Sequence, residues 1–418
     1  MRTLTLRRVV VTGLGAVTDC GHSAPATWDS MIHGRSGIGP VTAFQQSGDW
    51  SVTFGGEVRN LDFTKVLDPR DAKRMDRYCI FGYTAACEAA MDSGIDFTSG
   101  DPYRRGVAIG SGIGGIETIE QGINKIAQSG PRMVNPFTVP KLMLNSCSGH
   151  VSIRFGLRGS NVATATACAS GSHAIGAAYH FIQRGDADVM IAGGAEGSVT
   201  QLCMASFAAM KALSTRNDAP TEASRPFDRD RDGFVLSEGA GVIVLEELEH
   251  AKARGARIYA ELVGYGVSGD AHHIAAPDPA GAGAQRAMVN ALADAQLSPD
   301  AIGYINAHGT STPLGDAAEV AAVKQVFGHH ATKLSVSSTK GVTGHGLGAA
   351  GGIETVATVM AVKSGILPPT INLHSPDDGF DLDFVPNHAK ERSIRYAINN
   401  SFGFGGHNTS LVFARFEG

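Results

Sequence analysis

The segment "NVATATACASGSHAIGAAYHF", residues 161 to 181, joins a β-rich run to a stretch with helical periodicity. "NVATATA" is typical of a strand, and "SGSHAIGAAYHFIQRGD" is typical of a helix. Cys168 therefore lies at a predicted strand-to-helix turn, where the helix dipole and free N–H groups are expected to stabilise a thiolate and lower its pKa. This position among small residues favours a nucleophile over an inert buried thiol.

The same alternation of strand and helix continues on both sides of this segment. Short apolar runs such as "RRVVVTGLG", "RRGVAIGSG", "DVMIAGGAEG", "GVIVLEE", "AIGYINAHG" and "KLSVSST" alternate with Ala-rich helical stretches. The pattern predicts an α/β fold whose sheets are covered on both faces. Because "GARIYAELVGYGVSGD" restarts the pattern after a charged turn, we expect two halves, residues 1–254 and 255–418, although no clear sequence repeat relates them.

Composition excludes several classes of protein. The chain has 418 residues, 43% of them hydrophobic, and a net charge of −5, which does not favour nucleic acid or an anionic membrane as a partner. Six cysteines without a CxxC pair indicate reduced thiols and a cytoplasmic location. The apolar run near the N-terminus is too short for a signal peptide. The uncharged stretch between Arg158 and Arg184 is rich in Asn, Ser, Thr and Gly, so we expect a buried element rather than a membrane span.

Two motifs resemble ligand sites but lack the residues that those sites need. "GSGIGG", Gly110 to Gly115, has the spacing of a dinucleotide-binding loop, yet no Asp or Glu occurs from residue 121 to 185 to bind a ribose. "DRDRDGFVLSEG" begins like a calcium loop, but Gly239 occupies the position where a bidentate Glu belongs. We therefore predict neither a dinucleotide nor a calcium site.

The partner of Cys168 is expected to come from a distant part of the chain. His173 lies five residues further along the predicted helix, about 140° around its axis, and is poorly placed. Among the fifteen histidines, His308 in "INAHGTSTPLGD" and His345 in "SSTKGVTGHGLGAAGG" differ from the rest. Each lies at the end of a strand or the mouth of a helix, where open α/β sheets bind ligands. Either could be structural alone, but together with Cys168 they indicate a catalytic site.

Several ordered motifs resemble one family along nearly the whole chain. "TACASGSHAIG", "INAHGTSTPLGD", "SSTKGVTGHGLGAAGGIE" and "NNSFGFGGHN" closely resemble the β-ketoacyl-acyl-carrier-protein synthases, and the elongating type II enzymes most of all. The resemblance implies a thiolase-like fold with a layered α-β-α-β-α core and a homodimer. It also implies a cytoplasmic acyltransferase of fatty-acid biosynthesis that performs a decarboxylating Claisen condensation. No cofactor is expected, because phosphopantetheine arrives on the acyl carrier protein.

The resemblance assigns roles to residues that match the family motifs. Cys168 would take the acyl chain as a thioester, while His308 and His345 would promote loss of CO₂ from malonyl-carrier protein and stabilise the enolate. The backbone N–H groups of Cys168 and Phe404 would hold the thioester oxyanion. Lys340 would support the histidines together with Glu354, although a purely structural ion pair fits this pair nearly as well.

Further matches concern the substrate and the carrier protein. The expected substrate-binding residues are Thr310 and Thr312 for the pantetheine arm, Phe404 as a gate, Ile113 and Phe207 in the acyl-pocket wall, and Phe402 beside the gate. Residues 121 to 185 contain basic but no acidic residues, and "PRDAKR" adds Arg70, Lys73 and Arg74. These three match a docking patch for the acidic carrier protein, although each could also be an ordinary solvated side chain.

Three departures from the family pattern leave the chain length and the pathway open. His407 stands where the family usually has Thr, Ala169 where a hydroxyl residue is common, and Gly346 where a bulkier residue is usual. The alternatives are a ketosynthase of a type II polyketide or other specialised pathway, and a non-catalytic chain-length partner. The latter is disfavoured because such partners lack the nucleophilic Cys. A thiolase would need a second Cys near the C-terminus, but the last cysteine is Cys203.

Overall fold

One large sheet with two equivalent halves forms the centre of the molecule. The computed structural model describes residues 5–418. Within them ten strands pair in the order β10 (Ser335–Ser337), β9 (Ile302–Asn306), β13 (Tyr396–Gly403), β14 (His407–Ala414), β8 (Ala260–Gly269), β1 (Val9–Thr18), β7 (Gly239–Glu247), β6 (Val189–Glu196), β4 (Arg105–Gly110), β5 (Asn161–Val162).

The strand pairing is the same in both halves. β1 pairs antiparallel with β7 over most of its length, whereas it meets β8 only at Val9, Val10 and Val11. On either side of this short seam two antiparallel pairs are followed by two parallel pairs towards the outer edge. The order of strands therefore repeats on the two sides of the seam.

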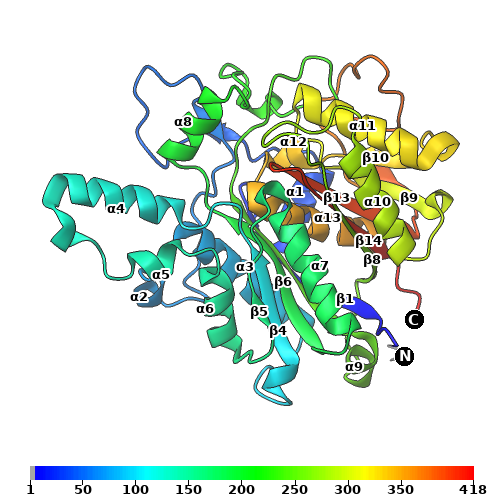
Figure 1. Cartoon of the computed structure of the whole chain (residues 1–418), viewed down its shortest axis with the longest axis horizontal. Helices are drawn as coiled ribbons and strands as arrows, with labels where there is room; N and C mark the ends of the chain where they lie inside the picture. The colour runs from blue at the N-terminus through cyan, green and yellow to red at the C-terminus, as the bar shows by residue number, and fades with distance from the viewer. Residues whose placement is uncertain (1–4) are drawn as a thin grey trace.

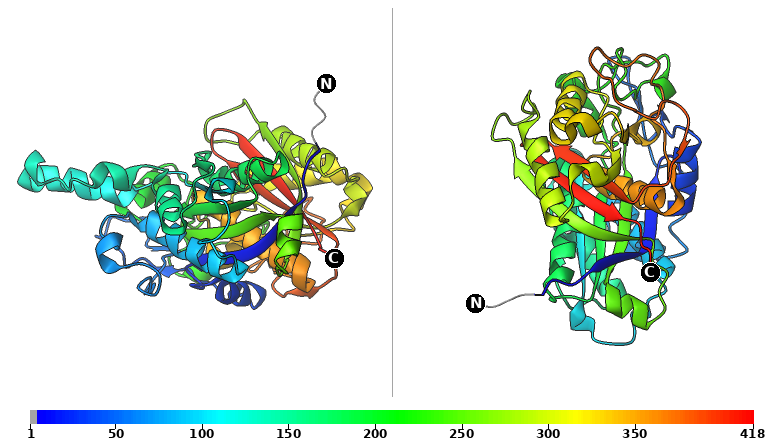
Figure 2. Two further views of the ribbon diagram at one scale, coloured as in Figure 1. Left: turned by 90° about the horizontal axis from the view of Figure 1, so that it is seen from below. Right: turned by 90° about the vertical axis from the view of Figure 1, so that its right-hand side faces the viewer.

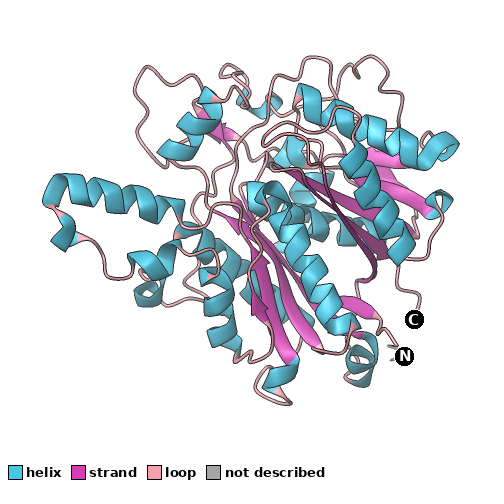
Figure 3. Cartoon of the chain, in the orientation of Figure 1, coloured by secondary structure: helices cyan, strands magenta, loops and turns pink. Residues whose placement is uncertain are grey.

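Helices form three layers around the two halves of the sheet (Figures 1 and 3). On one outer face α3 (Arg77–Ser93) contacts β1, β6 and β7. On the other, α10 (Ala282–Asp294) covers β8 and β14 and packs against α11 (Pro313–Phe327). Between them α7 (Ser170–Gln183) and α13 (Ala350–Ser364) contact each other and strands of both halves. The expected α-β-α-β-α layering is confirmed.

The remaining elements surround this core. Two small sheets consist of β2 (Gly39–Pro40) with β3 (Phe54–Gly55), and of β11 (Ile366–Leu367) with β12 (Lys390–Glu391). The other helices are α1 (Ala24–Ile32), α2 (Pro69–Ala72), α4 (Ile116–Ser129), α5 (Thr138–Leu142), α6 (Ser146–Phe155), α8 (Gln201–Ala209), α9 (Leu248–Ala253) and α12 (Lys340–Thr343).

The strands and helices predicted from apolar runs are present, with one difference at the opening segment. Of "NVATATA" only Asn161–Val162 forms a strand, β5. The residues that follow leave the edge of the sheet, and Thr164 and Thr166 bond locally to Ser170. This shortening places Cys168 in a loop anchored by hydroxyl groups rather than directly at a strand end.

The segment from α4 to α5 projects from the body of the molecule (Figure 1, and the left view of Figure 2). Large apolar side chains on it are exposed: Ile123, Ile126, Met133, Phe137 and Val139. Within the described part of the chain, no helix has the length and apolar character needed to cross a membrane.

Candidate active site

Cys168 lies in a single 3-10 turn, Ala167–Ala169, directly before α7. Ala167 has a φ of 49°, a left-handed conformation that is costly for a non-glycine residue and persists where its surroundings fix the chain. Ser170 supplies that restraint, because its Oγ donates to Ala167 O at 2.7 Å and accepts from Thr166 N at 2.9 Å. The turn therefore presents Cys168 in one orientation.

Burial raises the pKa of the Cys168 thiol to about 12. The Lys340 ammonium and the backbone N–H groups of Phe404 and Cys168 oppose this shift without cancelling it. The lowered pKa expected from the helix N-terminus is therefore wrong for the free enzyme. Only 8% of Cys168 is exposed, and the lost hydration of a thiolate outweighs the helix dipole. The resting thiol is therefore protonated near pH 7.

The hairpin between β13 and β14 brings Phe404 against the turn Ala167–Ala169, which carries Cys168 and is called the nucleophile turn below. A Cβ atom on Gly403 would lie 2.7 Å from Thr166 O and 3.1 Å from Cys168 N, so only glycine permits this approach. The backbone N–H of Phe404 consequently faces the sulfur of Cys168, as does the N–H of Cys168 itself. Two N–H groups converging on one reacting centre have the arrangement of an oxyanion hole. The Phe404 side chain is partly exposed.

His308 and His345 lie side by side, with ring centroids 5.2 Å apart and planes at 84°. His308 follows β9, and His345 precedes the 3-10 turn that opens α13. Both are buried, and burial, aided by the charge of Lys340, holds the pKa of each imidazole well below its usual value. Both rings are therefore neutral near pH 7 and can donate a hydrogen bond without carrying charge.

Lys340 determines which nitrogen of His308 carries the proton. Its Nζ donates to His308 O at 2.5 Å and lies 3.5 Å from His308 Nδ1, and it forms a buried ion pair with Glu354. Because an ammonium group has no acceptor, Nδ1 must offer its lone pair. The proton of His308 is therefore on Nε2, which makes that nitrogen a donor.

Glu319, which was not predicted from the sequence, holds the His308 loop. Its carboxylate accepts hydrogen bonds from the backbone N–H of His308 at 2.9 Å and of Gly309 at 2.7 Å, and from Asn400 Nδ2 at 3.2 Å. Burial raises its pKa to about 7. The available signal was an acid between Ala318 and Val320, inside an otherwise apolar helix stretch.

The two residues predicted for the acyl-pocket wall lie near the nucleophile. Ile113, in the loop after β4, and Phe207, on α8, belong to the same apolar cluster as Cys168. An acyl chain attached to the sulfur would therefore meet apolar side chains. Phe402 is placed differently: its ring packs against that of His308, with centroids 5.7 Å apart, so its direct contact is with a histidine.

Thr310 and Thr312 lie together at the start of α11, with their hydroxyl oxygens 3.0 Å apart. Thr312 Oγ1 also accepts from Gly315 N at 3.2 Å and caps the helix. Thr312 thus has a structural function besides any contact with substrate.

The three basic residues predicted for docking are exposed on and just after α2. The Arg74 guanidinium lies over the ring of Phe137, 5.2 Å from its centroid, and 3.6 Å from Asp71. Arg70 and Lys73 lie on the same short segment. The segment also carries acids, so the patch is smaller than the sequence composition indicated.

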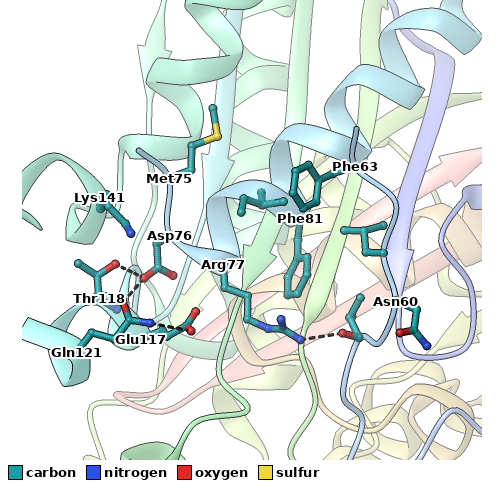
Figure 4. Close-up of a pocket in the computed structure, with 13 residues that line it drawn as sticks. Asn60, Phe63, Met75, Asp76, Arg77, Phe81, Glu117, Thr118, Gln121 and Lys141 are labelled. Carbon is teal, nitrogen blue, oxygen red and sulfur yellow. Dashed lines mark hydrogen bonds between the residues drawn. The ribbon is translucent and has the colours of Figure 1, made fainter. Parts of the chain in front are cut away.

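A cavity of about 410 Å³ is lined by residues other than those predicted for the site (Figure 4). Apolar side chains of α3 and of the segment before α2 form one wall, and charged groups form the other. Asp76 accepts from Thr118 N and Oγ1, and Arg77 donates to Val58 O. Both charged side chains are thus held by neighbouring residues, which makes the cavity a structural feature beside the docking residues.

His173 and His407 meet beside the nucleophile turn. Their rings are perpendicular, with centroids 6.3 Å apart, and His173 Nδ1 lies 3.0 Å from both Thr166 Oγ1 and Ala169 O. The departure at His407 thus lies on the hairpin that carries Phe404, with its ring against the helix that follows Cys168. Gly346 has ordinary backbone angles and room for a Cβ atom, so its backbone does not require glycine.

No cluster of three or more potential metal ligands occurs within residues 5–418.

The sequence matches two family models, the "Beta-ketoacyl synthase, N-terminal domain" over residues 6–251 and the "Beta-ketoacyl synthase, C-terminal domain" over residues 259–374.

Curated relatives and solved structures are similar over nearly the whole chain. The 3-oxoacyl-[acyl-carrier-protein] synthase 2 of Synechocystis sp. is 50% identical over 417 residues, covering 100% of both chains. That of Vibrio harveyi is 50% identical over 413 residues, covering 99% of both. A solved type II polyketide ketosynthase, in complex with its acyl-carrier protein and bound to a hexaketide, has a TM-score of 0.92 at 34% identity, covering 99% of this chain and 100% of its own.

Proposed function

The chain belongs to the β-ketoacyl synthase family, and we propose that Cys168, His308 and His345 carry out its reaction. It is an acyltransferase of the 3-oxoacyl-[acyl-carrier-protein] synthase type that acts in fatty-acid chain elongation. It condenses malonyl-carrier protein with an enzyme-bound acyl thioester and releases CO₂ and 3-ketoacyl-carrier protein. The reaction needs no cofactor of its own, because the carrier protein brings the phosphopantetheine arm.

The first half-reaction transfers the acyl group to Cys168. The sulfur attacks the carbonyl carbon of the incoming thioester, and the negative charge on oxygen is held by the N–H groups of Cys168 and Phe404. When the bond to the pantetheine sulfur breaks, the departing thiolate takes up the proton that Cys168 loses. Two fixed N–H donors lower the barrier even though the thiol starts protonated.

The second half-reaction generates the carbon nucleophile. The C–C bond to the malonyl carboxylate breaks, CO₂ leaves, and its electron pair passes into an enolate. The enolate oxygen accepts a hydrogen bond from His308 Nε2–H and a second from His345. Neutral donors suit this step, because they stabilise the charge as it develops and do not bind the malonyl carboxylate as tightly as cations would.

Condensation follows at the acyl thioester of Cys168. The enolate carbon attacks the acyl carbonyl, a new C–C bond forms and the bond to Sγ breaks. The product is extended by the acetyl unit that malonate supplies. Sγ leaves as a thiolate and takes a proton from solvent, which restores the buried thiol for the next cycle.

The observation that carries this assignment is the convergence of segments far apart in the sequence. The Cys168 sulfur faces the Phe404 N–H, and the paired rings of His308 and His345 lie within the same buried region. The test combines purified protein with malonyl- and acyl-carrier protein and measures CO₂ and 3-ketoacyl product. Cys168→Ala should abolish acyl transfer, whereas Cys168→Gln should still decarboxylate malonyl-carrier protein. Condensation retained by Cys168→Ala would contradict the mechanism.

The remaining site residues are assigned by their contacts. Lys340 is proposed to hold His308 in its donor tautomer, and Phe402 to orient the same ring from its other side. Thr310 and Thr312 are proposed to bond the pantetheine arm, and Ile113 and Phe207 to line the acyl chain. Arg70, Lys73 and Arg74 are proposed to dock the acidic carrier protein; they are exposed, and electrostatic steering needs no buried contact.

A homodimer is proposed on the basis of the projecting segment from α4 to α5. Its Ile126, Met133 and Val139 are exposed large apolar side chains, and several of these on one projecting segment favour a covered interface. β5 adds a short free sheet edge in the same half. A second copy of the chain would cover both.

The two halves are proposed to divide between Arg254 and Gly255, at the start of the segment that leads into β8. The strand order on either side of the seam supports this division. A cytoplasmic location is proposed because all six cysteines are free thiols.

A ketosynthase of a type II polyketide pathway is the second candidate. The observation favouring it is the similarity in structure to a solved polyketide ketosynthase. The higher identity to the elongating synthases weighs against it. Turnover of fully reduced acyl chains in preference to polyketide intermediates would support elongation, and the opposite preference would support the alternative.

A further inference from the structure

Glu196, the last residue of β6, is a buried carboxylate held by neutral donors. Its side chain is fully inaccessible. Oε1 accepts from Ser111 Oγ at 2.8 Å and from Ile113 N at 3.2 Å, and Oε2 accepts from Gly112 N at 2.8 Å and Gly348 N at 2.9 Å. A buried carboxylate with this many donors is an anchor for the segments that supply them.

Two segments bond to this carboxylate, and the turn that carries Cys168 lies against one of them. A Cβ atom on Gly348 would lie 2.3 Å from Gly112 N and 2.7 Å from Glu196 Oε2, and one on Gly112 would lie 3.3 Å from Ala167 O. The loop of residues 111–113 is therefore pressed against the turn that carries Cys168 and the turn that opens α13. A displacement of Glu196 would affect this loop first, since the loop donates three of the four hydrogen bonds that the carboxylate accepts.

The loop matters because it carries Ile113. The backbone N–H of Ile113 is bonded directly to Glu196, and its side chain lies in the apolar cluster that contains Cys168 and Phe207. The position of the Ile113 side chain, and with it the depth of the space beside the sulfur, thus depends on the carboxylate.

Only a carboxylate satisfies all of these donors. It offers two acceptor oxygens, whereas a glutamine offers one and turns an NH₂ group towards N–H donors on the other side. An aliphatic residue would leave every donor unpaired. A neutral substitution of the same size therefore loosens the loop without removing a group that touches substrate.

We propose that Glu196 is a positioning residue that sets acyl-chain discrimination by fixing the Ile113 loop against the nucleophile turn. The inference rests on the proposed function, because it assigns an acyl chain to the space beside Cys168. It concerns the length of the acyl chain that the enzyme prefers.

The test compares Glu196→Gln with the unaltered enzyme on a series of short, medium and long saturated acyl-carrier proteins. We expect the ratio of kcat/KM between the best and the poorest acyl chain to change by about tenfold. One or two methylene groups in an apolar pocket change kcat/KM by at least this factor. Malonyl decarboxylation, measured in a Cys168→Gln background, should stay within about twofold, because it does not use the acyl pocket.

Ser111→Ala provides a milder variant in case Glu196→Gln does not fold. It removes the bond to Oε1 and the bond that Ser111 Oγ accepts from Gly114 N, so its profile should shift in the same direction by less. Glu319→Gln is the contrasting variant, since its carboxylate holds the His308 loop and its loss should reduce decarboxylation instead.

The failure of the inference alone and the failure of the proposed function give different results. If Glu196→Gln and Ser111→Ala lower kcat/KM equally for every chain and lower decarboxylation in parallel, Glu196 is merely structural and the inference fails. If the unaltered enzyme forms no acyl-enzyme with any chain, the proposed function fails and the inference fails with it.

Discussion

Replacing Gly403 by alanine would test whether the Phe404 N–H stabilises the reacting oxyanion. The added Cβ would lie 2.7 Å from Thr166 O, and an ordinary contact begins at 3.4 Å. The hairpin must therefore retreat by about 0.7 Å, the difference between these two distances. A hydrogen bond of ~2.9 Å lengthened by this amount is no longer a hydrogen bond. Loss of one oxyanion donor lowers kcat by roughly 10²- to 10³-fold.

The assay is the rate at which Cys168 becomes acylated by acyl-carrier protein, followed by intact mass. Gly403→Ala should slow acylation by about 10²-fold and destabilise the fold by about 1–3 kcal/mol through overpacking. Decarboxylation in a Cys168→Gln background should be nearly unchanged, because the enolate is held by histidines. Gly149→Ala is the matched control, since no atom lies within 4 Å of its added Cβ. Acylation at the normal rate by folded Gly403→Ala protein would refute the proposed oxyanion hole.

Four further outcomes are expected. Lys340→Met removes a cation that lowers the pKa of His308, so the acid limb of malonyl decarboxylation, measured against pH, should move to higher pH. Burial raises the pKa of Glu88 from 4.5 to about 7. Because the unfolded chain binds fewer protons than the folded chain between these pH values, the free energy of unfolding should fall as pH rises through this window. Glu88→Gln should remove up to about 1.4 kcal/mol per pH unit of that slope, measured by urea unfolding. Lys73→Glu should raise KM roughly fivefold for carrier-bound substrate but leave a free pantetheine thioester unaffected. Ile126→Asp should yield monomers in light scattering, and an unchanged dimer would contradict the proposed interface.

Cys168, His308 and His345 could be chosen as candidates from the sequence because each lies in a motif whose residue types and spacing are specific. Cys168 precedes a helix, and His308 and His345 follow a strand or precede a helix in glycine-rich loops. The position of each residue relative to a strand or helix can be predicted from the residues next to it in the sequence. The alternation of apolar runs likewise predicted the core strands, since their burial on both faces leaves continuous apolar stretches.

The electrostatic properties of the site could not be predicted, because they depend on which distant groups surround each residue. The helix N-terminus predicted a lowered pKa for Cys168, yet burial by residues from both halves raises it. Glu196 and Glu319 were missed for the same reason. Each is an acid within an apolar stretch, and its function becomes visible only when the backbone N–H groups of another segment are placed around it.

The two halves of the sheet carry equivalent turns whose similarity is not visible in the sequence. Ala167 and Leu347, with φ of 49° and 47°, each begin a 3-10 turn that leads into α7 or α13. A Cβ atom on Gly171 would lie 2.8 Å from Gly352 N, and one on Gly351 would lie 2.8 Å from Ser172 N. The two helix starts therefore touch, although "ACASGS" and "LGAAGG" share little beyond small residues. One turn carries Cys168 and the other follows His345, so these candidate catalytic residues come together only where the two helix starts meet.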